Sequence, residues 1–377
     1  MATKGKAKLV EKPKGNFRNI YKSEKNDPIN YFSVEIHDID ISLINALKRT
    51  IQSDIEIPGF RGEDDPSITI LENNGPLHNE ILLHRIGLIP IHFNEDEVEN
   101  FKSDEYLFEV EVSNEESSMI NVTTEQMKVY HNEKPLTKAE IERLFPKNPH
   151  TESYILINRL RPKEKLHFKG HAVLGTATEH SGFSPVSLCS FHYLQDPKLL
   201  AELPANATIL DKERAYYRNE YGDANVVKFE LEIECGLDAK YLISKSIEIL
   251  MNKLNKTLNE IMADHSDYIQ IIPSDNAIGY LFIFQNENDT LGNLLQSYMH
   301  NYYIRSKNLT TQNKQVSYVG YICPHPLEPV MHLKIVIQNK DETSATNKQE
   351  YIELLSEHCR RSIGYLQDIK SKWLLSL

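Results

Sequence analysis

The chain has 377 residues, and at about 150 residues per domain this length predicts two or three domains. Hydrophobic residues make up 40% and charged residues 25%, the balance of an ordinary globular protein with a sizeable core. The net charge of −12 argues against a protein that grips DNA phosphates by itself, because such binding depends on lysine and arginine. The four cysteines lie at least 36 residues apart, which excludes a disulfide scaffold and a C-x-x-C metal or redox pair.

Residues 1–27 predict a basic, flexible tail, whose lysines are Lys4, Lys6, Lys8, Lys12 and Lys14. We favour a solvated arm over a nuclear or nucleic-acid-contacting patch. No apolar segment follows these lysines, so we expect no secretory signal. The longest apolar stretches fall far below the ~20 residues that cross a bilayer, so we expect no membrane span. The few cysteines favour a reducing, intracellular environment.

The first folded region alternates strand and helix patterns. Alternating apolar residues predict a strand at Tyr31–His37. Ser42 is a candidate N-cap for a helix, whose apolar residues follow at three- and four-residue spacing: Leu43, Ile44, Leu47 and Ile51. A strand at Ser67–Leu71 and a helix at Asn79–Arg85 come next, and Gly87 is placed to end that helix.

Residues 93–225 change in character and predict an inserted, β-rich domain with long loops. Short strand patterns occur at Tyr106–Val112 and Tyr154–Ile157. Gly182–Ser187 has the composition of a loop, and Asp196–Tyr221 is polar and helix-forming.

A clean strand pattern returns at Val226–Glu234, and a long helix with a narrow apolar seam follows it. The seam consists of Ile243, Ile247, Leu250, Leu254, Leu258 and Ile261. We predict that residues 28–92 and 226–265 form one discontinuous module, which a short linker at about Ala263–Tyr268 joins to the rest of the chain.

Residues 266–377 predict a second module with the order strand–helix–strand–strand–helix. The strands are expected at Tyr280–Phe284, Val316–Tyr321 and His332–Ile337. The first helix carries Leu291, Leu294, Leu295, Tyr298, Met299 and Tyr302. The terminal helix carries Ile352, Leu355, Cys359, Ile363, Leu366 and Ile369.

The fold class is therefore α+β, and the two narrow helix seams need cover. We favour pairing of the two modules through these helices over the alternative that each helix covers only its own sheet. The residues predicted to form this internal dimerisation contact are Ile243, Ile247, Leu250, Leu254, Leu291, Leu295, Leu355, Cys359, Ile363 and Leu366.

The sequence patterns that resemble catalytic or metal sites each lack a required residue or spacing. We therefore predict no catalytic residue, cofactor or metal. Gly170–Thr176 resembles a phosphate-binding loop in its glycines but has Thr176 where the lysine must stand. His167 and His171 lie four apart on a strand pattern, where that spacing does not converge on one metal. The acid pairs at Asp38/Asp40 and Asp64/Asp65 lack a third carboxylate.

Two other segments are unusual. His84 and Arg85 interrupt an apolar stretch, and the pattern fits a buried helix end with a solvated basic pair as well as a docking surface anchored by Arg85. Pro324–Pro329 contains three prolines, which fits a rigid inter-strand loop or a preorganised docking loop.

The motifs of the front portion carry a family resemblance. Asn45–Ile51 and His84–Pro90 resemble the N-terminal domain of the RNA polymerase alpha subunit, and more closely its relatives, the archaeal D protein and the third subunit of polymerase II. His171–His180, with Phe183–Val186, resembles the inserted domain of those proteins.

The rear portion resembles their small partner, called L in archaea and the eleventh subunit in polymerase II. The matching segments are Asp289–Leu295 and Gly320–Pro329. The two resemblances together cover about residues 28–375. Joining both subunits in one chain is similar to the fused subunit of large nucleocytoplasmic DNA viruses, which implies a viral origin.

The resemblance implies a non-catalytic assembly platform of DNA-directed RNA polymerase, acting in transcription. Its expected partners are the largest and second-largest subunits and small accessory subunits, with nucleic acid contacted only through the complex. We expect one copy per complex, an internal pseudo-heterodimer. The positions that match the family's docking elements are Asn45, Lys48, Arg49, His84, Arg85, Gly87, Pro324, His325 and Pro326.

One departure from the family concerns metal binding. Many members carry a cysteine cluster in the inserted domain that holds zinc or an iron–sulfur cluster, whereas residues 93–225 contain only Cys189. We therefore expect no metal there. The alternative function is a stand-alone interaction scaffold or transcription regulator. A viral chain is expected in a cytoplasmic virus factory, and in the virion if packaged; otherwise the nucleus is expected.

Overall fold

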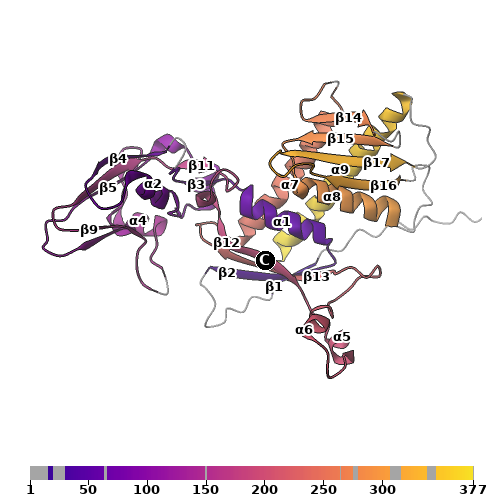
Figure 1. The fold of residues 1–377 in the computed structure, drawn as a ribbon, viewed down its shortest axis with the longest axis horizontal. Coiled ribbons are helices and arrows are strands. Elements are labelled where there is room, and N and C mark those ends of the chain that lie inside the picture. Colours follow the sequence, from indigo (N-terminus) through magenta and orange to yellow (C-terminus); the bar gives the residue numbers. More distant parts are fainter. Residues whose placement is uncertain are drawn as a thin grey trace, which may run out of the picture.

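The structure is a computed structural model that describes the backbone of residues 16–19 and then residues 30–62, 66–148, 151–263, 265–274, 279–305, 316–337 and 345–376. Most of the predicted tail, the Asp64/Asp65 pair and one residue of the predicted linker lie outside these ranges. The fold is α+β, as predicted, with several small sheets and long helices (Figure 1). Within the described residues, no helix is long and apolar enough to span a membrane.

The front portion is built on a four-stranded antiparallel sheet with the order β1-β2-β13-β12. Its strands are β1 (Asn16–Asn19), β2 (Tyr31–His37), β12 (Val186–Tyr193) and β13 (Val226–Ile233). Alternate residues of β2 and β13, such as Val34 and Phe229, are buried and form one apolar face.

The rear portion is built on a second antiparallel sheet with the order β14-β15-β17-β16. Its strands are β14 (Ile269–Pro273), β15 (Tyr280–Gln285), β16 (Val316–Ile322) and β17 (Val330–Ile337). Sequence reasoning missed β14, which begins directly after the predicted linker and is only five residues long.

Four long helices join the two sheets (Figure 1). They are α1 (Ile41–Ser53), α7 (Ala239–Ile261), α8 (Asp289–Met299) and α9 (Ala345–Leu375). Helix α7 packs on α9, and α1 packs on both α7 and α8. The predicted cap of α1 was wrong: Asp40, not Ser42, caps the helix, and its Oδ1 accepts from the Ser42 N–H at 2.7 Å.

The inserted lobe contains a five-stranded sheet and two short strand pairs, drawn at the left of Figure 1. The sheet consists of β4 (Ile68–Asn73), β10 (Lys165–Gly170), β5 (Tyr106–Ser113), β7 (Lys128–His131) and β8 (Lys134–Pro135). The pairs are β3 (Ile57–Gly59) with β11 (Val173–Gly175), and β6 (Ile120–Thr123) with β9 (Leu156–Leu160). Its helices are α2 (Asn79–Gly87), α3 (Glu95–Glu99) and α4 (Lys138–Leu144).

Strand pairing crosses the predicted boundaries of the inserted domain. Strand β12 falls inside residues 93–225 but pairs with β13 of the front sheet. Strand β4 falls inside residues 28–92 but pairs with β10 of the lobe. The predicted loop at Gly182–Ser187 overlaps the start of β12, whose polar residues hide its strand pattern.

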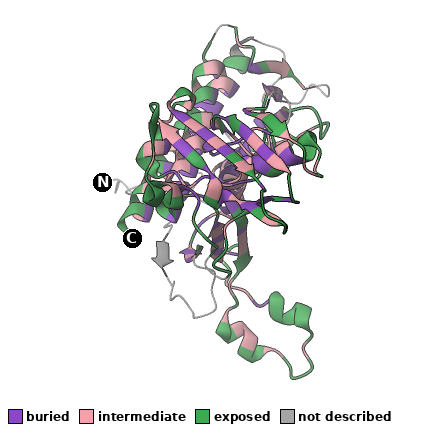
Figure 2. Cartoon of the chain, turned by 90° about the vertical axis from the view of Figure 1, so that its left-hand side faces the viewer, coloured by how far each residue is buried: buried purple, intermediate pink, exposed green. Residues whose placement is uncertain are grey.

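A helical arm leaves the front sheet between β12 and β13 and projects from the body (Figure 1, Figure 2). It carries α5 (Pro197–Glu202) and α6 (Ile209–Glu213), and no residue of either helix is buried. The prediction of helix within Asp196–Tyr221 is therefore confirmed for these two short segments.

Candidate docking surface and internal junction

The two helices that carry the predicted seams, α7 and α9, pack together in antiparallel fashion. Three contacts fix this direction, because successive residues along α9 contact residues with successively lower numbers on α7 or at its end. They are Ser356 with Met262, Lys370 with Glu248, and Trp373 with Lys240. The predicted pairing of the two modules through their long helices is thus confirmed.

The residues predicted to form the internal dimerisation contact are almost all buried. Ile363 is half-buried, and the others are at most 2% exposed: Ile243, Ile247, Leu250, Leu254, Leu291, Leu295, Leu355, Cys359 and Leu366. Burying one such side chain stabilises a fold by about 1.5–3 kcal/mol. Separating the portions would expose a large part of this apolar surface.

Trp373 is a junction residue that sequence reasoning missed. It is the only tryptophan in the chain and is 0% exposed. Its Nε1–H donates to the Lys240 carbonyl at 3.3 Å, and its ring meets the Phe32 ring edge-on at 6.0 Å. The spacing of Leu366, Ile369 and Trp373 continues the α9 stripe and was the signal that could have found it.

Polar contacts also cross the junction. The Asp40 carboxylate, which caps α1, accepts from Ser297 Oγ at 2.9 Å and from Asn301 Nδ2 at 2.6 Å. Arg305 forms an ion pair with Asp223, which lies at the base of the projecting arm. The front and rear portions are therefore joined by directional contacts as well as apolar ones.

The predicted docking residues of α1 lie beside the rear portion. Asn45, Lys48 and Arg49 are half-buried, and Arg49 Nη1 lies 3.9 Å from Asp289 Oδ2 at the start of α8. Burial and the neighbouring Asp289 raise the pKa of the Cys323 thiol to about 11, while Arg49 acts in the opposite direction. Arg49 thus lies close to the residue that precedes the proline-rich loop.

The proline-rich loop, residues 324–329, is exposed along its whole length. Leu327 at its tip is 86% exposed. His325 closes the turn, because its Nδ1 accepts from the Leu327 N–H at 3.2 Å and its carbonyl accepts from the Glu328 N–H at 3.3 Å. The loop with Pro324, His325 and Pro326 thus begins directly after Cys323, the residue on which Arg49 acts.

The predicted docking residues of α2 lie in the inserted lobe, apart from α8 and β16 (Figure 1). The Arg85 guanidinium donates to the carbonyls of Leu156 and Ile157 at 2.8 and 3.0 Å, so it ties α2 to β9. Gly87 is buried, and a Cβ there would lie 3.1 Å from the backbone nitrogen of Gly62. The prediction that the helix ends at Gly87 is confirmed. The bonds of Arg85 to β9 and the close approach of Gly87 to Gly62 are structural roles that sequence reasoning did not include.

His84 is exposed, and the loop at residues 176–180 links it to the end of α1. Its ring meets the His180 ring at 6.3 Å. Two residues earlier in that loop, Thr178 Oγ1 donates to the Ser53 carbonyl at 2.9 Å. The two groups of docking candidates are thus separate clusters that the loop at residues 176–180 connects.

The histidines and cysteine rejected as metal ligands have other partners. His167 Nε2 lies 2.9 Å from Glu109 Oε1, and His171 Nδ1 lies 2.7 Å from the Tyr106 carbonyl. Burial raises the pKa of the Cys189 thiol to about 12, and its Sγ contacts the Lys48 carbonyl at 3.7 Å. Within the described ranges, no three histidine, cysteine or acidic side chains are grouped to hold a metal ion.

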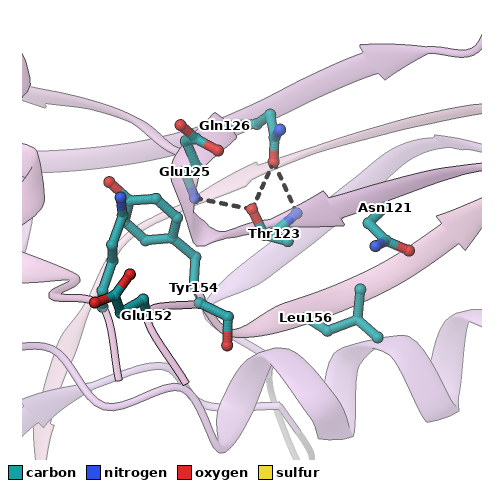
Figure 3. A pocket seen from close by; sticks show the side chains of 9 residues that line it. Asn121, Thr123, Glu125, Gln126, Glu152, Tyr154 and Leu156 are labelled. Carbon is teal, nitrogen blue, oxygen red and sulfur yellow. Dashed lines mark hydrogen bonds between the residues drawn. The ribbon is translucent and has the colours of Figure 1, made fainter. Parts of the chain in front are cut away.

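A polar hollow of about 480 Å³ lies in the inserted lobe, and Figure 3 shows the side chains that line it. Its lining groups serve local structure: the Thr123 hydroxyl caps a short 3-10 turn, and its backbone N–H donates to Gln126 Oε1 at 2.7 Å. Glu125, Glu152 and Tyr154 border the hollow, and none of them was a predicted site residue.

Comparisons with known proteins agree with this geometry. Residues 280–372 match the family model of the RNA polymerase Rpb3/Rpb11 dimerisation domain. Human DNA-directed RNA polymerases I and III subunit RPAC1 is 25% identical over 294 residues, covering 63% of this chain and 83% of the relative. DNA-directed RNA polymerase subunit Rpo3 of Thermococcus kodakarensis is 26% identical over 262 residues, covering 60% of this chain and 92% of the relative. Rpo3 of Methanobrevibacter smithii is 27% identical over 182 residues, covering 47% of this chain and 58% of that protein. The chain therefore contains an Rpb3/Rpb11-type dimerisation domain and is homologous to the RNA polymerase subunits RPAC1 and Rpo3.

Proposed function

We propose that this chain is a non-catalytic assembly subunit of a multisubunit DNA-directed RNA polymerase, on which the two largest subunits dock. The observation that carries the proposal is the antiparallel packing of α7 on α9. It joins a front portion and a rear dimerisation domain within one chain, as an internal pseudo-heterodimer. The front portion would act as the larger partner of the pair and residues 266–377 as the smaller one.

The proposed fusion has a physical consequence for assembly. Seven residues separate the end of α7 from the start of β14. Such a tether makes association intramolecular, with an effective concentration on the order of mM, and fixes the ratio of the portions at one to one. We propose that the portions pair first and that the large subunits and small accessory subunits join afterwards. The joined architecture is also the reason for proposing a viral source.

We propose that the docking surface includes the exposed loop at residues 324–329, Arg49, which acts on Cys323 at the start of the loop, and Lys48 on the same helix as Arg49. Prolines limit the freedom of the loop before it binds, so less conformational entropy is lost on docking. Leu327 offers an apolar side chain at the tip, and Arg49 offers a neighbouring cation. An apolar anchor beside arginine is a common composition for an interface hot spot.

The test is co-purification of the full chain with the two largest subunits of its polymerase. Arg49→Ala and Leu327→Asp should each lower the recovery of the two largest subunits. For Arg49→Ala the loss of recovery should grow as the salt concentration rises. Arg49→Ala should fold normally, because an ion pair this exposed and 3.9 Å long contributes little to stability. The matched control is Ile209→Asp, which changes an equally exposed apolar residue, 76% accessible, on the projecting arm.

Recovery of both large subunits with the wild-type chain, and its loss with the loop variants alone, would support the proposal. Equal recovery with Leu327→Asp, Arg49→Ala and the control would contradict the docking surface. Failure of the wild-type chain to recover any polymerase subunit would favour the alternative of a stand-alone scaffold or regulator.

A further inference from the structure

One cluster of charged and polar side chains in the junction includes a nearly fully buried carboxylate, Glu287. Asp54 and Lys253 come from the front portion, on α1's C-terminal cap and on α7. Glu287 and Tyr268 come from the rear portion, just before α8 and just before β14. Lys253 Nζ lies 2.8 Å from Asp54 Oδ2 and 3.9 Å from Glu287 Oε2, so the lysine faces acids from both portions.

Glu287 is the most enclosed member of this cluster. It is 5% exposed, and its Oε1 accepts from the Tyr268 hydroxyl at 2.7 Å. Among the residues that the structure describes, none donates a hydrogen bond to its Oε2. Burial raises the pKa of Glu287, and the positive charges of Lys253 and Lys256, both on α7, act against that rise. The charge of a rear-portion residue is therefore compensated by lysines of the front portion.

This cluster is not an efficient way to strengthen the junction. Buried ion pairs often contribute no more stability than apolar or neutral residues of similar shape, because both charges lose their hydration. Removing one partner is the damaging change, because a buried charge is then left alone. A buried charged cluster of this kind therefore contributes more to the choice of binding partner than to the affinity for that partner.

Discrimination is needed here because the two seams are alike. Both α7 and α9 bury mainly leucine and isoleucine along a narrow stripe, to which α9 adds Trp373 near its end. Apolar burial is not directional, so these stripes permit two front portions or two rear portions to pair. In a crowded solution of nascent chains, such like-with-like pairs would compete with the correct one.

We propose that Asp54, Lys253 and Glu287 form a charge key that makes the rear portion pair with the front portion and not with a second copy of the rear portion. A rear–rear pair would cover two Glu287 carboxylates without a lysine. A front–front pair would leave each Lys253 with its own Asp54 at 2.8 Å, so the key acts against rear–rear pairing. The key acts on pairing of the two portions and does not depend on whether large subunits dock afterwards.

The first experiment compares refolding of full-length chains. The key is neutralised in the triple variant Asp54→Asn, Lys253→Met and Glu287→Gln. The matched control neutralises another ion pair of α7, Lys245 with Glu99 at 2.6 Å, through Lys245→Met and Glu99→Gln. Each chain is unfolded in urea, refolded at rising concentration and analysed by size-exclusion chromatography with light scattering. We expect at least tenfold more dimer from the triple variant than from wild type or control, at an unchanged or higher urea midpoint.

A second measurement tests the pair directly and does not require the triple variant to fold. Lys253→Met alone should lower the urea midpoint, because it removes the cation that acts most strongly on the buried Glu287 and leaves Lys256 alone to oppose the burial of its charge. Adding Glu287→Gln to Lys253→Met should restore the midpoint. Absence of this rescue, or a triple variant that refolds with the dimer fraction of wild type, overturns the proposal. A triple variant that loses stability without gaining dimer also overturns it, because the cluster would then be structural only.

Discussion

Replacement of Trp373 by alanine is the sharpest test of how the rear portion is held on the front portion. The indole is fully buried, yet it lies in the last turn of the chain's last helix. Its contacts are with the front portion, through the Lys240 carbonyl and the Phe32 ring. Removing it takes away an anchor at the far end of α9 and leaves α9's own hydrogen bonding unchanged.

The expected loss follows from the area and the cavity. A buried aromatic side chain of this size covers about 150–250 Å², which corresponds to about 4–6 kcal/mol at about 25 cal/mol per Å². Measured replacements of buried aromatic residues by alanine cost about 3–5 kcal/mol. We therefore expect Trp373→Ala to lower the free energy of unfolding by about 3–5 kcal/mol, a large part of the 5–15 kcal/mol typical of a folded protein.

The measurement is urea unfolding followed by circular dichroism, because the variant lacks the only tryptophan fluorophore. Leu375→Ala is the control: Leu375 is two residues later and 86% exposed, so its loss should change stability by about 0.5 kcal/mol or less. An unchanged midpoint for Trp373→Ala would refute the assignment of this residue as the anchor of the junction.

Three further predictions concern other points of the fold. Gly87→Ala should destabilise the chain by about 1–3 kcal/mol, because the added Cβ would lie 3.1 Å from backbone. Gly364→Ala should stabilise the chain by about 0.5–1 kcal/mol, because the space around its Cβ in α9 is open. The melting temperatures of both variants test these two effects. Arg85→Gln should destabilise the chain by about 1–3 kcal/mol in urea unfolding, because two carbonyls of β9 lose their donor. Glu287 has a raised pKa in the folded chain, so the folded state holds its proton more tightly, and wild type should lose stability relative to Glu287→Gln as the pH rises above about 4.5. Unfolding free energies of both chains between acid and neutral pH test the sign, and a constant difference across that range would contradict it.

The long elements could be predicted because one periodicity runs through each of them. Strand β2 lies where alternation placed it, at Tyr31–His37. The seams of α7 and α9 were read from three- and four-residue spacing, and those helices extend beyond the seams to Ala239–Ile261 and Ala345–Leu375. A stripe that is too narrow for a sheet face also predicted that each helix would meet another helix.

The parts that could not be predicted depend on contacts distant in sequence. No local sequence pattern indicates that the Arg85 guanidinium donates hydrogen bonds to carbonyls of β9, or that Gly87 lies against the backbone of Gly62. Both residues stand in a motif matched by the family resemblance, where exposure and docking were the natural reading. The assignment of β4 to the lobe and of β12 to the front sheet also depends on distant partners. Strand β4 pairs with β10, more than 90 residues away, and β12 pairs with β13, on the other side of the projecting arm.

The position of the rear portion on α7 is fixed at three separate points along α7. The short linker, which can span at most about 25 Å, leaves α7 at Ile261 and leads to β14, and α7 itself is about 35 Å long at about 1.5 Å per residue. Trp373 of α9 docks at the opposite end, on Lys240, and Glu287, just before α8, faces Lys253 between them. A slip of the rear portion along α7 by one turn, about 5.4 Å, would withdraw the indole from its contacts at one end and strain the linker region at the other. A uniform apolar stripe would tolerate such a slip with little loss, so it is the anchor, the tether and the charged cluster together that give this junction a single arrangement.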